Sequence, residues 1–331
     1  MIALDANGAD GGPRTVAEGG RRSGVPVTLF GPAAELPDGV EVVDAPVAVG
    51  NHEEPVRAVR SKPDASVVQA AKAVADGRCS ALVSAGSTGA ALAAGVLHIR
   101  RLQGVHRPGV AAFLPIPGAP TLMLDVGANV EVRPEHLVQF AFMGSAFMQT
   151  MHAVERPRVG LLSVGAEATK GTPDVVAAHE RLAGAPGIDF IGNVEGTDVP
   201  AGAADVVVTD GFTGNVALKL MEGTAKTVVG AVRDAVRSGA VSSLGGLLIR
   251  RRVGALRETL DPNATGGAIL LGLRHPVVIA HGGSSAEGIA NAVRLAERAV
   301  QEDAVGRMAA ALEAGGALRS APVDSVEVAH D

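Results

Sequence analysis

Short apolar runs rich in β-branched residues recur along the chain, and each run ends in a polar turn that contains glycine. Six runs follow this plan, at residues 81–84, 122–124, 159–164, 190–191, 205–208 and 277–280. Continuous apolar runs are typical of strands buried on both faces, as in a parallel sheet covered by helices. The pattern therefore predicts a central sheet whose polar turns lie at the strand ends.

Four segments between these runs carry apolar residues at helical spacing. They span residues 65–75, 134–151, 216–236 and 287–299. Alternating strands and helices predict an α/β three-layer sandwich, Rossmann-like, with a mostly parallel sheet. Because the turns after parallel strands leave the carboxyl edge, we expect all of them, and the active site, at one edge.

The composition excludes several classes of partner. The chain has no Trp, no Tyr and seven Phe, and its net charge is −6. It therefore lacks both the aromatic stacking and the positive charge that favour nucleic acid binding. Cys79 is the only cysteine, which excludes an internal disulfide and favours the cytoplasm. No stretch approaches the roughly 20 apolar residues of a membrane span.

We expect residues 1–314 to form a single α/β domain. Two segments differ from the rest of the chain, an insertion within this domain and a tail after it. A basic helical insertion at about 240–262 has apolar residues on one face beside Arg250, Arg251, Arg252 and Arg257. These arginines are candidates for contact with a membrane or an acidic carrier, and a plain dimer or surface helix is the alternative. Residues 315–331 lack periodicity, which predicts a mobile tail.

The glycine-rich turns do not match the familiar nucleotide-binding motifs. No G-x-G-x-x-G and no Gly-Lys pair occurs, which disfavours a nicotinamide or P-loop enzyme. The scattered histidines contain no H-E-x-x-H, so we expect no metal site and no cofactor. Turns that enter helix N-termini still bind anions, and several on one edge suggest a ligand that carries phosphate. Tight strand-to-helix connection is the alternative role of such turns.

Lys170 and Asn215 are the strongest catalytic candidates. Lys170 lies in a polar turn after a buried run, where an ammonium can meet an oxyanion, although a solvated surface lysine is the alternative. Asn215 closes the turn 210–215 and offers an amide donor, with a helix N-cap as the alternative. Both residues suit a reaction in which negative charge develops on oxygen.

A serine-hydrolase arrangement is a weaker interpretation. Ser87 lies in a turn similar to a nucleophile elbow, and Ser87, Asp210 and His281 occur in the order found in hydrolases. The strict motif requires glycine where Ala85 stands. We therefore favour Ser87 as a phosphate ligand or helix cap and His281 as a turn histidine.

Taken in order, the turns resemble the PlsX family of bacterial phosphate acyltransferases over residues 1 to about 300. The resemblance is carried by six motifs, at residues 2–10, 54–60, 84–90, 124–130, 192–195 and 208–216. It departs from the family at Asn7, Ala9 and Gly11, where Met, Gly and His are usual, and at Thr169, where Gly often precedes the lysine. A diverged paralogue with another acyl donor or acceptor is therefore an alternative.

The resemblance implies a fold similar to isocitrate dehydrogenase and phosphotransacetylase, and an enzyme that makes acyl phosphate from acyl-acyl carrier protein and inorganic phosphate for phospholipid synthesis. It also implies a homodimer that associates peripherally with the membrane, and acyl-transfer roles for Lys170 and Asn215. Phosphate and substrate contacts are expected from the turn residues Asp5, Gly8, Gly86, Ser87, Thr88, Gly89, Asp125, Asn129, Glu167, Asp210, Thr213, His281 and Ser284.

Direct attack of phosphate on the thioester is the mechanism we expect. Lys170 would neutralise phosphate or the oxyanion, Asn215 would donate to the carbonyl oxygen, and backbone N–H groups at 86–89 and 282–285 would hold phosphate. A covalent route through Ser87 is the alternative mechanism. The rival functions are an oxidoreductase of the isocitrate dehydrogenase type and an inactive membrane scaffold.

Overall fold

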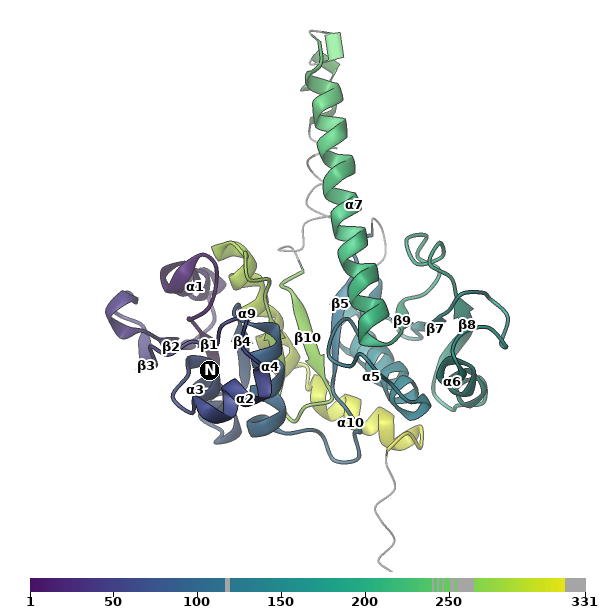
Figure 1. Cartoon of the computed structure of the whole chain (residues 1–331), viewed down its shortest axis with the longest axis horizontal. Helices are drawn as coiled ribbons and strands as arrows, with labels where there is room; N and C mark the ends of the chain where they lie inside the picture. Colours follow the sequence, from purple (N-terminus) through teal and green to yellow (C-terminus); the bar gives the residue numbers. More distant parts are fainter. Residues whose placement is uncertain are drawn as a thin grey trace, which may run out of the picture.

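The computed structural model describes residues 1–116, 120–239, 241–242, 244–245, 247–250, 254 and 265–318. Over these residues it contains an 11-stranded sheet with helices on both faces (Figure 1). The strand order is β3-β2-β1-β4-β11-β10-β5-β6-β9-β7-β8. Strands from the end of the chain therefore lie at the centre of the sheet.

The amino-terminal side of the sheet is a parallel set of five strands. Its members are β3 (Glu41–Asp44), β2 (Val27–Gly31), β1 (Ile2–Asp5), β4 (Ala81–Ser84) and β11 (Val277–Ile279). β1, β4 and β11 are buried along their whole length, which explains why their sequences are continuous apolar runs.

The other side of the sheet is a second parallel set that begins at β6. Its members are β6 (Leu122–Leu124), β9 (Val206–Val208), β7 (Arg158–Leu162) and β8 (Asp189–Val194). Between the two sets lie β10 (Ala268–Leu271), antiparallel to both of its neighbours, and β5 (Gly109–Phe113), antiparallel to β10 and β6. The two parallel sets consequently run in opposite directions.

The sheet is mostly parallel, as expected. The expectation that the turns after all the strands lie at one edge was wrong, because the two parallel sets run in opposite directions. The turns after β1, β4 and β11 leave one edge, here called the Asp5 edge. The turns after β6, β9 and β7 leave the opposite edge, here called the Asp125 edge. The apolar runs failed to reveal the reversal because they indicate that a strand is buried and carry no information about its direction.

Helices cover both faces of the sheet. One face packs against α1 (Gly12–Ser23), α5 (Pro134–His152), α6 (Pro173–Ala183), α9 (Ala286–Gln301) and α10 (Ala304–Ala314). The other packs against α2 (Pro55–Ser61), α3 (Ser66–Ala75), α4 (Thr88–Ala94) with its π-helical extension Gly95–Ile99, and the first turns of α7 (Gly211–Arg237). A short 3₁₀ turn, Ala33–Glu35, follows β2. All four helices predicted from periodicity are confirmed.

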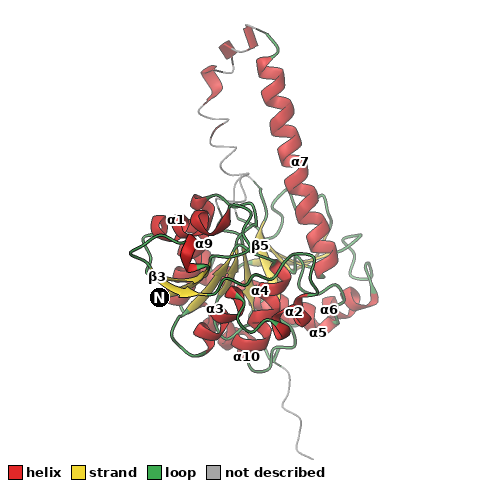
Figure 2. Cartoon of the chain, turned by 60° about the vertical axis from the view of Figure 1, so that its left-hand side comes forward, coloured by secondary structure: helices red, strands yellow, loops and turns green. Residues whose placement is uncertain are grey.

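Beyond its first turns, α7 projects away from the body of the protein (Figures 1 and 2). Its apolar residues Leu220, Val228 and Val232 are exposed, at 68%, 55% and 44%. Among the described residues, none of the helices is both long enough and apolar enough to cross a membrane.

The basic insertion and the tail fall mostly outside the described residues. Arg250 is described and exposed, whereas Arg251, Arg252 and Arg257 are not described. Of the segment 315–331, residues 315–318 are described, and the carbonyl of Ala317 accepts a hydrogen bond of 2.8 Å from Gln139. The rest of the expected tail lies outside the described residues.

Candidate active site

The structure separates the predicted site residues into three groups. The Asp5 edge holds Asp5, Gly8, Gly86, Ser87, Thr88, Gly89, His281 and Ser284. The Asp125 edge holds a group around Asp125 that includes Asn129, Asp210, Thr213 and Asn215, and beside it the turn with Glu167 and Lys170. Lys170 and Asn215 therefore follow neighbouring strands, β7 and β9.

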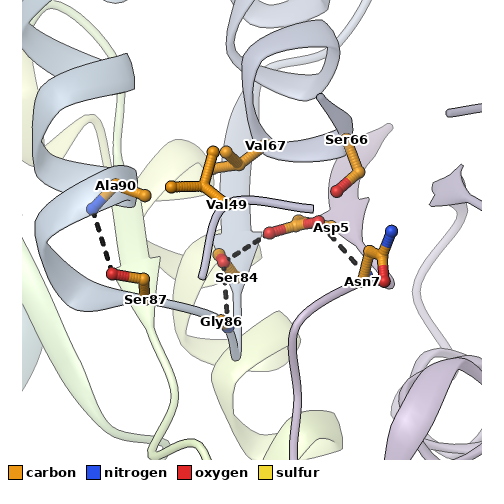
Figure 3. A pocket seen from close by; sticks show the side chains of 9 residues that line it. All are labelled: Asp5, Asn7, Val49, Ser66, Val67, Ser84, Gly86, Ser87 and Ala90. Atoms are coloured by element: carbon orange, nitrogen blue, oxygen red, sulfur yellow. Dashed lines mark hydrogen bonds between the residues drawn. The ribbon is translucent and has the colours of Figure 1, made fainter. Parts of the chain in front are cut away.

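At the Asp5 edge, the carboxyl of Asp5 lies buried at the end of β1, with 2% of the residue exposed. Ser84 at the end of β4 donates its hydroxyl to Asp5 Oδ2 over 2.6 Å, and the Asn7 N–H donates to Oδ1 over 3.2 Å. The Gly86 N–H donates in turn to Ser84 Oγ (Figure 3). These residues border a cavity of about 10 Å³, which is room for about one water molecule.

Burial raises the pKa of Asp5 from 3.8 to about 6 because a carboxylate is costly to remove from water. Hydrogen bonds from the Ser66 and Ser84 hydroxyls and the Asn7 N–H oppose this rise. Among the described residues that line the cavity, Asp5 is the only one with an ionisable side chain. Near neutral pH the group is thus a buried anion stabilised by three neutral donors.

The other groups at the Asp5 edge mostly bond to one another. Ser87 caps α4, its Oγ accepting from the Ala90 N–H over 3.4 Å. The Gly283 N–H donates to His281 Nδ1, and the Ser284 N–H donates to the His281 carbonyl. Three of the N–H groups expected to hold phosphate, those of Gly86, Gly283 and Ser284, are therefore already paired, and His281 is a turn histidine.

The hydrolase-like interpretation of Ser87, Asp210 and His281 is wrong. Ser87 and His281 lie at the Asp5 edge, whereas Asp210 lies at the Asp125 edge. Both carboxylate oxygens of Asp210 are engaged by Thr213, one by its N–H over 2.8 Å and one by its hydroxyl over 2.7 Å. The order of the three residues in the chain carries no catalytic meaning here.

At the Asp125 edge, Asp125 is fully buried and accepts five hydrogen bonds. Its Oδ1 accepts from the N–H groups of Val110, Gly127 and Ala128, and its Oδ2 accepts from the N–H and the side-chain amide of Asn129, all between 2.7 and 3.1 Å. Burial raises the pKa of Asp125, while these donors oppose the rise because they stabilise the charged form. The Leu124–Asp125 peptide bond is cis.

The first turn of α7 packs directly on this loop. A Cβ at Gly214 would lie 1.9 Å from the Asp125 carbonyl oxygen, so only glycine permits the approach. Asp210 is the N-cap of α7, which shows that the alternative role of Asn215 as N-cap was wrong. Asn215 lies in the second turn, and a Cβ at Gly127 would lie 3.3 Å from its Nδ2. Its side-chain amide makes no hydrogen bond to the described residues.

Lys170 lies in the turn between β7 and α6 and is exposed. The turn is closed by the Lys170 N–H, which donates to the Glu167 carbonyl over 3.0 Å, and by Ser163 Oγ, which donates to the Lys170 carbonyl over 3.0 Å. Within the described part of the chain, the ammonium of Lys170 has no hydrogen bond and no ion pair. It is free to meet an anion.

Sequence reasoning missed three polar residues that shape these groups. Ser66 and Ser84 contact Asp5, and Asn193 donates its side-chain amide to the carbonyls of the Lys170 turn. Ser84 ends the apolar run of β4, and Asn193 lies just after the apolar run 190–191, so both are polar residues close to the end of an apolar run. That position was the available signal.

This fold is shared with solved phosphotransacylases and with a dehydrogenase. A phosphotransacetylase from Streptococcus pyogenes superposes with a TM-score of 0.60 at 18% identity, over 91% of this chain and 94% of the other. A branched-chain phosphotransacylase from Enterococcus faecalis V583 gives 0.56 at 17%, over 91% and 99%. A 4-hydroxythreonine-4-phosphate dehydrogenase from Klebsiella pneumoniae gives 0.53 at 16%, over 91% and 99%. At these identities the likeness defines the class of fold, a phosphotransacetylase-like α/β sheet.

Sequence comparison narrows the class to a family. Residues 1–307 match the family model described as fatty acid synthesis protein. The chain is 44% identical to a phosphate acyltransferase of Lacticaseibacillus casei, over 93% of this chain and 94% of that one, and 44% identical to one of Anaeromyxobacter dehalogenans, over 98% and 93%. The chain belongs to this family of phosphate acyltransferases, and it is an acyl-transferring enzyme, as the resemblance implied.

Proposed function

We propose that this enzyme transfers an acyl group from the thioester of an acyl carrier protein to inorganic phosphate. The products are acyl phosphate and free carrier thiol, at the entry to phospholipid synthesis. One observation carries the assignment: a lysine ammonium and an asparagine amide, both without partners among the described residues, follow neighbouring strands at the Asp125 edge. Such a pair suits two negatively charged oxygens that approach one another.

The reaction begins when a phosphate oxygen forms a bond to the thioester carbon. The carbonyl oxygen takes up negative charge, and the carbon–sulfur bond then breaks to release the thiolate, which takes a proton from solvent. Lys170 neutralises the incoming phosphate, and Asn215 donates to the carbonyl oxygen as its charge develops. Both substrate charges are met by fixed groups of the chain.

The role of Asp125 is to hold this arrangement in place. Its carboxylate organises the loop 125–129, and α7 begins against that loop, so the position of Asn215 depends on it. The N–H groups of Ser87, Thr88 and Gly89 lie at the opposite edge. We therefore revise the expected phosphate site and propose that phosphate binds beside Lys170.

Replacing Lys170 with alanine tests this proposal. The variant should lose about 2.7 to 4 kcal/mol of transition-state stabilisation, comparable to the loss of an oxyanion donor. The assay is phosphate-dependent release of free thiol from acyl-acyl carrier protein, scanned over acyl chain lengths. The matched control is Lys226→Ala, which removes an exposed lysine elsewhere in the chain, on α7, and should retain native turnover.

Native turnover of Lys170→Ala would refute the assignment of Lys170. Native turnover with acyl-coenzyme A and none with the carrier substrate would retain the chemistry and replace the donor. An absence of phosphate dependence in the native enzyme would overturn the whole proposal.

We also propose a cytoplasmic homodimer that contacts the membrane surface peripherally. The exposed apolar residues of α7 support a partner helix there. Exposed Leu247, Leu248 and Ile249 beside Arg250 support contact with an anionic membrane or an acidic carrier. Because this contact is electrostatic, sedimentation with anionic vesicles should weaken as salt rises. Sedimentation that does not change with salt would contradict the electrostatic contact.

A further inference from the structure

A buried side chain, that of Asn193 in β8, donates hydrogen bonds to the turn that carries Lys170. Asn193 is 8% exposed, and its Nδ2 lies 2.9 Å from the Glu167 carbonyl oxygen, 3.3 Å from that of Gly165 and 3.4 Å from that of Lys170. Three carbonyl oxygens thus converge on one amide nitrogen. The side chain ties together both ends of the turn.

The orientation of this amide is fixed by its other end. Asn193 Oδ1 lies 3.0 Å from His179 Nδ1 on α6. Because three carbonyls surround the nitrogen, the oxygen must face the histidine, and His179 Nδ1 must carry the proton that it donates. The His179 ring is held in turn by an edge-on contact with Phe190, with 5.0 Å between the ring centroids.

An irregularity in β8 places Asn193 where it can do this. The pairing of β7 with β8 shifts between Val159 and Gly160, so that Phe190 pairs with Val159 and Gly192 with Gly160, and Ile191 is the extra residue. A bulge of this kind reverses the alternation of side chains and re-aims those that follow. Gly192 has a φ of +94°, which glycine adopts readily, and the next residue turns under the Lys170 loop.

We infer that Asn193 is a positioning residue for acyl transfer, acting through Lys170. Asn193 is buried, and its side chain contacts the backbone of the turn 165–170 and His179. Its effect is to hold the Lys170 backbone so that the ammonium meets phosphate in the reactive geometry. The inference rests on the proposed function of Lys170.

A double-mutant cycle with Lys170→Ala and Asn193→Ala tests the inference. Asn193→Ala should lower kcat by up to about 100-fold, the cost of displacing a reacting group by about 1 Å, and should also raise the phosphate KM, because phosphate is proposed to bind beside Lys170. In the Lys170→Ala background the same substitution should have almost no further effect, because its route to the reaction has been removed.

A matched control separates positioning from general loss of structure. Gln139 is another buried amide, 1% exposed. Within the described residues its side chain bonds to backbone groups alone, donating to the carbonyls of Gly104 and Ala317 and accepting from the His106 N–H. Gln139→Ala should lower thermal stability and retain native kcat. His179→Phe retains ring packing on Phe190, removes the Nδ1 donor and should lower kcat in the same direction as Asn193→Ala, by less.

The outcomes are distinguishable. Native kcat for Lys170→Ala refutes the proposed function, whatever Asn193 does. An impaired Lys170→Ala with native kcat for Asn193→Ala, or with equal losses from Asn193→Ala in both backgrounds, refutes the positioning role alone. If Asn193→Ala does not fold, His179→Phe decides: native kcat in that variant refutes the inference, and a lowered kcat that disappears in the Lys170→Ala background supports it.

Discussion

Asp5 and Asp125 occupy corresponding places in the two halves of the sheet, since each is a buried carboxyl where a buried strand ends. Their surroundings differ. Asp125 receives five N–H donors, whereas Asp5 has two hydroxyls and one N–H around it. The comparison shows that the same sequence element, an apolar run followed by aspartate, supports a rigid loop in one half and a titratable buried group in the other.

The largest expected effect is at Asp125. Asp125→Ala should lower the free energy of unfolding by about 4 kcal/mol or more, because five buried or half-buried N–H donors would lose their acceptor at once. Urea unfolding, read at its midpoint with an unchanged slope, measures this change. A loss below about 1 kcal/mol, the net worth of a single hydrogen bond, would mean that the loop does not depend on the carboxylate.

The next effect is the pH dependence contributed by Asp5. Because its pKa is raised from 3.8 to about 6, the folded state binds this proton more tightly than the unfolded chain. Asp5 therefore contributes stability that is present below pH 4 and lost as pH rises through 6. A pKa raised from 3.8 to about 6 corresponds to about 3 kcal/mol at this buried group.

Asp5→Asn should remove this dependence, since the neutral amide has no charge to bury. Unfolding free energies of the native enzyme and the variant, measured from about pH 4 to about pH 7, should diverge in favour of the variant as pH rises. Parallel curves would show that Asp5 is not the group responsible, and the contrast with Asp125 would fail.

The smallest effect is at Ser87. Ser87→Ala removes the N-cap of α4 and should cost about 1 kcal/mol of stability, while kcat and the phosphate KM remain near native. Mass spectrometry should find no acyl adduct when the native enzyme meets the acyl donor without phosphate. A large rise in the phosphate KM, or an adduct at Ser87, would move the chemistry to the Asp5 edge.

Much of the fold follows from local pattern, because burial and periodicity act over a few residues. The runs at 81–84 and 122–124 coincide with β4 and β6, and the expected helix at 134–151 ends one residue short of α5. The reversal of strand direction across β10 and β5 is a long-range property that no short pattern encodes. Lys170 was recognised from its place in a turn, whereas the role proposed for Asn193 depends on a bulge in an edge strand that the local sequence did not reveal.

The central position of β11 has a consequence for the synthesis of the chain. β11 lies between β4 and β10, and α9 packs against α1, so the amino-terminal half of the sheet lacks a strand and a covering helix until residues 277–301 leave the ribosome. The second parallel set, β6 to β9, is contiguous over residues 122–208. The half of the sheet that is synthesised first is therefore completed last. The edge of β4 stays unpaired until β11 has been translated.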